Sequence, residues 1–221
     1  MLLGWLTNLL RTMPRPSNTE ERRAQITGAL MKVMAQRGYD GAAIADIAQA
    51  ARLTPGLIHY HFRNKQEILL AALDDLVTRH RERLDARLKK ALADPAAEVA
   101  AFIDFHLGLG AEADPEALAC WILLSGEALR QAEVRVAFEA AVEATIARLA
   151  VAIRRGVEQR SFDCESIEAS ASAIVAAIQG YFVLAATARR VIPRGSAAAS
   201  TKRMAEGLLR PAGAVKGRRK G

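Results

Sequence analysis

The chain has 221 residues, 51% of them hydrophobic, and is therefore long enough to bury one large core or two smaller ones. Helix-favouring residues dominate and β-branched residues are sparse, which argues against a sheet protein and favours an all-α fold. The net charge of +7 is uneven: residues 1–65 carry nine basic and four acidic residues, whereas residues 202–221 carry seven and one. Basic ends suggest a polyanion such as nucleic acid, although such a surplus is commonly only a solvated surface.

The N-terminal segment, residues 1–17, is expected to be a flexible extension. Its apolar start lacks the basic region and cleavage site of a signal peptide, and either Met1 or Met13 can be the native start. The two cysteines, Cys120 and Cys164, form neither a disulfide framework nor a metal-ligand spacing, which indicates a cytoplasmic protein. No cofactor or metal is indicated.

The first predicted helix runs from Glu20 to Arg37, where apolar residues recur at helical spacing. Asn18 and Thr19 can cap it, and Gly38 ends it. Two short helices follow over 44–51 and 55–62, and each needs tertiary support because it has fewer than three turns.

Six longer helices complete the chain, predicted over 65–92, 96–109, 115–129, 133–159, 164–190 and 197–209. Asp114, Asp163 and Ser196 are the expected helix-start signals for three of them. Ala171–Ala188 is the most apolar run, but polar residues interrupt it, so we expect a buried helix and no membrane span. Residues 211–221 have no apolar face and are expected to be a disordered basic tail.

The two short helices have the pattern of a helix-turn-helix. A tight turn at Arg52-Leu53 separates them, and Thr54-Pro55 is a suitable N-cap and first residue for the second helix. Leu53, Ile58 and Phe62 are expected to face inward. In a helix-turn-helix the N-terminal part of the second helix faces bases and phosphates in the major groove.

This region resembles the N-terminal DNA-binding region of the TetR family over residues of about 22 to 73, through RGY, IADIAQAARLTPGLIHYHF and KQEIL. The resemblance implies a three-helix DNA-binding domain in 18–64 and a larger helical domain for ligand binding and dimerisation in 65–210. It also implies repression relieved by a small molecule. By position, the family's DNA contacts fall on Ile44, Thr54, Pro55, Gly56, Leu57, His59, Tyr60, His61 and Lys65.

Two departures from the family pattern affect the phosphate contacts. Ala42 and Ala43 stand where threonine is common, so a hydroxyl cap is missing, and we expect Asp40 or a backbone amide to substitute. Arg52 stands where the family favours glycine; a positive φ there would cost about 1 kcal/mol, and a phosphate contact by Arg52 could offset it. Arg22 and Arg23 either contact phosphates or are solvated, and both alternatives stay open.

Aromatic and polar residues in the second domain either line a ligand pocket or form plain core. The pocket hypothesis takes Phe102, His106, Trp121, Glu127, Gln179 and Phe182 as ligand-binding residues. Trp121 with Glu127 is compatible with a cationic ligand. The stretch ACWILLSGEA is faintly similar to the choline-responsive regulators of the same family, and no ligand is transferred from it.

Small residues in the last two long helices suit either intrachain packing or a dimer interface, and the resemblance favours a homodimer on an inverted-repeat operator. The leading function is a sequence-specific transcriptional regulator, a repressor released from double-stranded operator DNA by a small-molecule effector. The alternative is a non-specific architectural DNA-binding protein. An enzyme is not expected, because the sequence has no Gly-rich phosphate loop, nucleophile elbow or metal-ligand set. The operator, the effector, the regulated genes and repression against activation stay open.

Overall fold

The computed structural model describes residues 18–108, 114–188 and 190–210, and these ranges hold helices and no strands. The chain divides into two compact units, residues 1–72 and 73–221. The division falls inside α5 (Lys65–Leu88), so the first turns of this helix belong to the first unit. The predictions for residues 1–17 and 211–221 lie outside the described residues.

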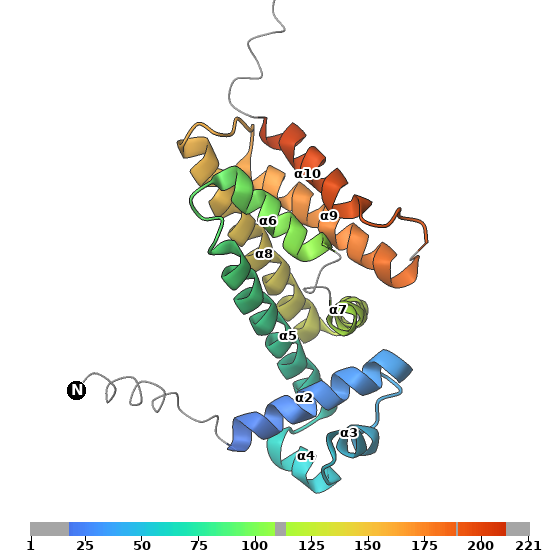
Figure 1. The fold of residues 1–221 in the computed structure, drawn as a ribbon. Helices are drawn as coiled ribbons and strands as arrows, with labels where there is room; N and C mark the ends of the chain where they lie inside the picture. Colours follow the sequence, from blue (N-terminus) through green and yellow to red (C-terminus); the bar gives the residue numbers. More distant parts are fainter. Residues whose placement is uncertain (1–17, 109–113, 189, 211–221) are drawn as a thin grey trace, which may run out of the picture. The chain divides into compact units, whose positions relative to one another are not determined.

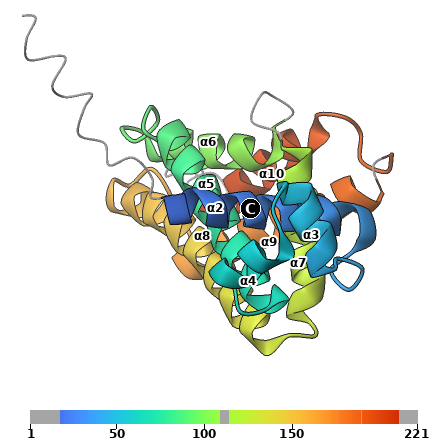
Figure 2. The same cartoon turned by 90° about the horizontal axis from the view of Figure 1, so that it is seen from below.

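The first unit is built on α2 (Asn18–Arg37), with α3 (Ile44–Ala51) and α4 (Pro55–His61) lying against it (Figures 1 and 2). Gly38 ends α2 as predicted, with φ of 72° and its amide bonded to the carbonyl of Met34. Asn18 and Thr19 lie inside the helix, because α2 begins at Asn18. The core of the unit consists of fully buried apolar side chains: Ile26, Leu30, Ile47, Ile58, Phe62, Ile68 and Leu69.

The second unit contains the rest of α5, α6 (Pro95–Leu107), α7 (Pro115–Ala128), α8 (Ala132–Glu158), α9 (Ile167–Thr187) and α10 (Ser196–Leu209). Within it α6 packs against α8, α9 and α10, and α7 packs against α8 and α9 (Figure 1). Its core is one hydrophobic cluster that includes Phe102, Ile103, Leu149, Ile153, Ile174 and Ile178. By length and composition α9 could cross a membrane, but one of its faces lies in this core.

Two helices, α5 and α9, have ends that differ from the prediction by three residues or more. The helix expected to reach Leu92 ends at Leu88, where the chain turns through a bond from the Ala91 amide to the Leu88 carbonyl. The helix expected from Cys164 begins at Ile167 and is capped by Ser166. Asp163 is not the cap, because its amide is bonded to the carbonyl oxygens of Leu209 and Arg210 at the end of α10.

The remaining helix-start signals give mixed results. Asp114 caps α7 as predicted, its carboxylate accepting from the Ala117 amide at 3.0 Å. Ser196 is not a cap, since it is the first residue of α10 and its hydroxyl donates to the Pro193 carbonyl.

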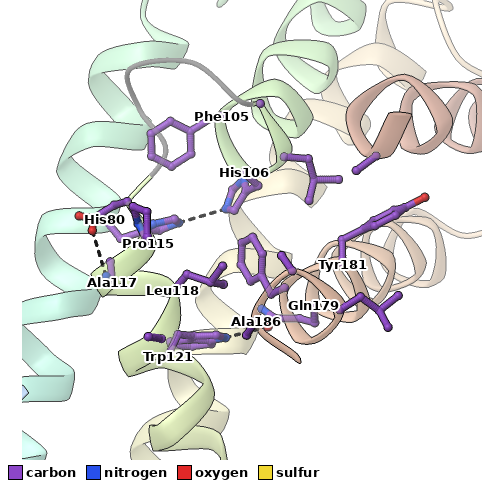
Figure 3. Close-up of a pocket in the computed structure, with 18 of the residues that line it drawn as sticks. His80, Phe105, His106, Pro115, Ala117, Leu118, Trp121, Gln179, Tyr181 and Ala186 are labelled. Atoms are coloured by element: carbon purple, nitrogen blue, oxygen red, sulfur yellow. Dashed lines mark hydrogen bonds between the residues drawn. The ribbon is translucent and has the colours of Figure 1, made fainter. Parts of the chain in front are cut away.

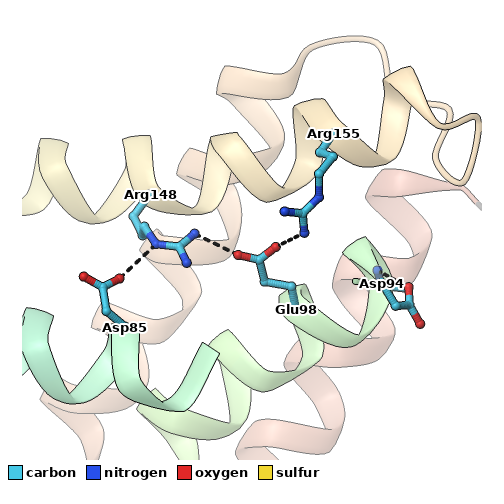
Figure 4. A network of polar contacts seen from close by, with 6 residues as sticks. Asp85, Asp94, Glu98, Arg148 and Arg155 are labelled. Carbon is cyan, nitrogen blue, oxygen red and sulfur yellow. Dashed lines mark hydrogen bonds and ion pairs between the residues drawn. The ribbon is translucent and has the colours of Figure 1, made fainter. Parts of the chain in front are cut away.

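A buried carboxylate joins three helices of the second unit (Figure 4). Glu98 of α6 is 1% exposed, and its oxygens pair with Arg148 at 2.9 Å and with Arg155, both from α8. Arg148 also pairs with Asp85 of α5 at 3.3 Å. Since removing one partner of a buried pair leaves an uncompensated charge, this network fixes how α5, α6 and α8 pack.

Candidate nucleic-acid interface and cavity

The start of α3 is capped without a hydroxyl. The carboxylate of Asp46 accepts from the Ala43 amide at 3.3 Å, and it also pairs with Arg37 at 2.9 Å. This is one arm of a capping box, and the arm that a threonine at Ala43 would supply is missing. Asp46 therefore supports the start of α3 without replacing the hydroxyl's own bond, and the expectation that Asp40 or a backbone amide substitutes for the hydroxyl stays a prediction. Ala42 is fully buried.

The turn between the two short helices is left-handed at Arg52, with φ of 55° and ψ of 42°. Its amide and that of Leu53 bond to the carbonyl oxygens of Gln49 and Ala48, which closes the C-terminus of α3. Arg52 therefore has the positive φ for which a non-glycine residue costs about 1 kcal/mol. The Arg52 side chain is exposed.

The second short helix, α4, begins as predicted. The Thr54 hydroxyl accepts from the Leu57 amide at 3.3 Å, and Pro55 is the first helical residue. Inside the unit lie Ile58 and Phe62, whereas Tyr60 is 80% exposed. Of the other candidate DNA contacts, some are exposed and some half-buried: Thr54, Pro55, Gly56 and His59 are exposed, and Ile44, Leu57, His61 and Lys65 are half-buried.

Arg23 of α2 braces the end of α4. Its guanidinium donates to the His61 carbonyl, lies 4.0 Å from the centre of the Phe62 ring and stands 3.8 Å from the Glu67 carboxylate. Arg22 donates to Gln25, which in turn donates to the Ala51 carbonyl. Arg23 is therefore a structural residue, which neither of the two open alternatives had foreseen.

Lys65, at the start of α5, also has an intramolecular partner. Its ammonium donates to the Tyr39 carbonyl at 2.8 Å and lies 4.2 Å from the centre of the Tyr39 ring. An ammonium has three donors, so this bond leaves two for another acceptor.

The second unit contains a cavity of about 630 Å³ between helices α5 to α10 (Figure 3). This volume suits a drug-sized molecule. Four of the six residues predicted to bind a ligand line it, namely His106, Trp121, Gln179 and Phe182.

Two pairs of polar side chains meet at the cavity (Figure 3). The Trp121 indole donates to the Gln179 side-chain oxygen at 2.7 Å. His80 and His106 place their Nε2 atoms 3.0 Å apart, and the other ring nitrogen of His106 lies 2.8 Å from the Phe102 carbonyl. Because a carbonyl only accepts, His106 Nδ1 carries the proton and His80 donates to His106 Nε2.

Burial keeps both imidazoles neutral. It lowers the pKa of His106 to about 3, with the neighbouring His80 adding to the effect and the bond to Phe102 opposing it. Burial also lowers the pKa of His80, helped by the positive charge of Arg83. His80 was not predicted as a cavity residue, since a single imidazole on the apolar side of a helix resembles a core residue.

Phe102 and Glu127 do not line the cavity. Phe102 is 1% exposed in the core. The Glu127 carboxylate accepts from Arg130 at 2.9 Å and from Gln131 at 2.8 Å, close to the end of α7. The suggested pairing of Trp121 with Glu127 around a cation is therefore wrong: six residues along a helix are about 240° apart around its axis.

Two family models match this chain. Residues 26–72 match the model described as bacterial regulatory proteins of the tetR family. Residues 95–210, more than half of the chain, match the model described as the C-terminal region of BetI-type transcriptional repressors.

Curated relatives match in part. The HTH-type transcriptional regulator BetI of Rhizobium meliloti is 31% identical over 123 residues, 56% of this chain and 60% of that protein. The HTH-type transcriptional regulator TtgR of Pseudomonas putida is 43% identical over 61 residues, 28% of this chain and 29% of that protein. The matches thus span less than two thirds of these relatives.

Solved structures are similar over most of the chain. A putative transcriptional regulator from Saccharomonospora viridis, solved in complex with choline, has a TM-score of 0.70 and 25% identity, covering 85% of this chain and 94% of that one. A TetR-family regulator from Cytophaga hutchinsonii has a TM-score of 0.77 at 18% identity, covering 88% and 98%, which shows a common fold.

Proposed function

We propose that this chain, which belongs to the TetR family of bacterial transcriptional regulators, is a repressor. Its C-terminal region is of the BetI type. In this proposal a small molecule releases the protein from an inverted-repeat operator. The family consists of DNA-binding regulators and not of enzymes. The proposed site of action is the cytoplasm, where the operator DNA is.

The observation that carries the proposal is the division of α4 into a buried and an exposed side. Ile58 is completely buried, whereas Tyr60, two residues on, is 80% exposed. A large aromatic ring that the unit itself does not cover can contact base edges and sugars in the major groove.

The proposed DNA-contacting face surrounds Tyr60. Capping by Thr54 and the left-handed turn at Arg52 present the N-terminus of α4, where backbone amides and a helix dipole favour phosphate. Among the described residues no atom beyond its own stretch of helix lies within 4 Å of the place a Cβ on Gly56 would take, so a DNA backbone can approach it closely. The full proposed set is Ile44, Arg52, Thr54, Pro55, Gly56, Leu57, His59, Tyr60, His61 and Lys65.

A homodimer through α9 and α10 is the proposed assembly. The exposed side of α9 carries small residues at helical spacing, Ala169, Ala173, Ala176 and Gly180, which let a second helix approach closely. On α10 the exposed Met204, with 49% of its surface accessible, adds apolar area. A two-fold dimer presents two copies of α4 about one DNA turn apart, which suits an inverted repeat.

The cavity of the second unit is the proposed effector site. An effector can release the dimer from DNA only if it binds the DNA-free state of the dimer more tightly than the DNA-binding state. The Saccharomonospora viridis regulator was solved in complex with choline, so choline is a compound to test on this cavity. The lining residues supported as ligand contacts are His106, Trp121, Gln179 and Phe182, with His80 added.

The proposed function is tested with the full-length protein and DNA selected by it from a random duplex library. We expect an inverted-repeat consensus, and a gel shift with that duplex and a scrambled duplex at two salt concentrations should keep a large affinity ratio at both. A steep salt dependence with little discrimination would instead support the architectural alternative.

A charge variant tests the phosphate part of the same face. Lys65→Ala is expected to weaken binding to both duplexes and to lower the salt slope by about 1. The matched control is Lys32→Ala, which removes an exposed charge of α2 outside the proposed face. An effect of Lys65→Ala on one duplex alone would contradict a phosphate contact.

A further inference from the structure

The interior of the cavity is apolar and aromatic. Aromatic rings from three helices line it, including Phe105, Trp121, Tyr181 and Phe182. The Trp121 ring is stacked on Phe138 with 4.3 Å between centroids, so one of its faces is already covered. Such a lining recognises a ligand mainly through ring contacts and burial, with a few polar groups setting its orientation.

The inner polar groups carry no charge. His80 and His106 satisfy each other and are held neutral by burial. The Gln179 oxygen is taken by Trp121, and the amide nitrogen of Gln179 makes no hydrogen bond among the described residues. This nitrogen is a free donor, which suits an acceptor on the ligand.

Within the part of the chain that the structure describes, the charged residues of the lining are Arg83, Asp114 and Arg194. One carboxylate oxygen of Asp114 caps α7 and the other stands 3.6 Å from Arg83, so this acid is already compensated. Arg194 is exposed and makes no ion pair within the described ranges. The described lining therefore has a surplus of one positive charge, at Arg194.

We propose that this cavity takes an aromatic monoanion, a carboxylate or sulfonate whose charge lies beside Arg194 while its ring enters the apolar interior. A quaternary ammonium ion is disfavoured, because it would meet the surplus positive charge without a carboxylate to neutralise it. Arginine binds planar carboxylates through paired donors, which adds orientation to attraction. The inference rests on the proposed function only in treating this ligand as the effector.

The experiment compares two fluorescent probes that share their rings and differ in charge. Anilinonaphthalene sulfonate carries one sulfonate, and phenylnaphthylamine is its neutral counterpart. We expect the sulfonate to bind the full-length protein roughly tenfold more tightly, as a charge-assisted contact would give. Choline and benzyltrimethylammonium are expected not to displace it, whereas phenylacetate is.

Three variants test whether the sulfonate of the probe lies beside Arg194 inside the cavity. Arg194→Ala should remove the tenfold preference by weakening only the sulfonate, and Arg194→Lys should retain most of it. Arg190→Ala removes an exposed arginine nearby that does not line the cavity, and it should change nothing. Ala186→Trp fills the cavity, and it should abolish binding of both probes while circular dichroism shows unchanged helicity.

Several outcomes overturn the inference. The first is equal binding of the two probes, and the second is displacement by choline at a lower concentration than by phenylacetate. The third is an Arg194→Ala protein that keeps the preference for the sulfonate. The fourth is probe binding that survives both Ala186→Trp and a second cavity-filling variant, Leu118→Trp. Operator binding is measured on the same preparations. Selective operator binding with a preference for cations defeats only this inference, and the expected charge ranking without operator selectivity defeats only the proposed function.

Discussion

In residues 18–72 three long polar side chains bond to main-chain oxygens of neighbouring elements: Arg23 to His61, Gln25 to Ala51 and Lys65 to Tyr39. In residues 73–210 three groups of buried or half-buried polar side chains bond to one another. Glu98 pairs with two arginines, His80 with His106 and Trp121 with Gln179.

The two units are therefore expected to respond differently to substitution. The first holds its backbone rigidly and presents side chains to DNA, whereas the stability of the second depends on particular side-chain pairs. Main-chain tethers fix the path of the backbone and leave outward side chains such as Tyr60 free for a partner. Side-chain pairs depend on the identity and protonation of both members, so single changes act strongly on them. We therefore expect the second unit to lose stability steeply, and the first to lose DNA affinity while staying folded.

The largest expected effect is at Glu98. Glu98→Gln removes the charge that compensates Arg148 and Arg155, and it should lower the free energy of unfolding by about 3 kcal/mol. The estimate is at the low end for a buried pair because both arginines reach solvent. Urea unfolding followed by tryptophan fluorescence measures it.

The matched control is Glu168→Gln, which breaks an exposed pair with Arg154. We expect no measurable change, since exposed ion pairs contribute little. Equal effects of the two substitutions would show that burial does not distinguish the pairs, and the contrast between the two units would lose its basis.

The next effect is a pH dependence from His106. Its folded pKa is about 3 and its ordinary value is 6.5, so between these pH values the unfolded chain binds a proton that the folded chain does not. Stability therefore falls as the pH falls below 6.5, by about 2 kcal/mol at pH 5. Unfolding curves at pH 7 and pH 5 measure it.

Two variants sharpen this expectation. His106→Phe should remove most of the pH dependence, because the imidazole that most resists protonation is gone. His59→Gln changes an exposed imidazole of the first unit and should leave the slope unchanged. A slope that persists in His106→Phe would assign it to other groups.

The first unit could be predicted from sequence because its determinants are local. The Thr54 cap, the Pro55 start and the left-handed position at Arg52 all act within a few residues of where they occur. Arg23 was harder, since its partner His61 is 38 residues away and a guanidinium on α2 looks the same whether it faces solvent or a backbone oxygen.

The cavity could be predicted only in part, because residues far apart in the chain build it. His106 and Trp121 stood out as polar or aromatic groups on apolar helices, but helical spacing alone does not say which face meets a cavity. Glu127 illustrates this, because counting turns from Trp121 would have placed it on another face of α7. The role of His80 could not be predicted from the sequence, because it depends on α5 lying beside α6, where His80 meets His106.

In the first unit the larger expected effect is on DNA affinity. Tyr60→Ala should weaken operator binding by about 1 kcal/mol or more, because an exposed ring at the groove is lost, with helicity and unfolding unchanged. Tyr60→Phe removes only the hydroxyl and should keep the part of the operator affinity that the ring contributes. A gel shift with operator duplex measures both, and unchanged affinity in Tyr60→Ala would refute the assigned face.

The smallest effect is at the turn, where stability and affinity are expected to move in opposite directions. Arg52→Gly relieves the positive φ and should raise stability by up to about 1 kcal/mol. If Arg52 contacts a phosphate, the same change weakens binding to operator and scrambled duplexes alike and lowers the salt slope by about 1. Arg52→Ala separates the two effects, since it removes the guanidinium and keeps the backbone cost. A glycine variant that is more stable and binds DNA as before would show that Arg52 has a strained backbone and no phosphate contact. The DNA-contacting face would then begin at Thr54.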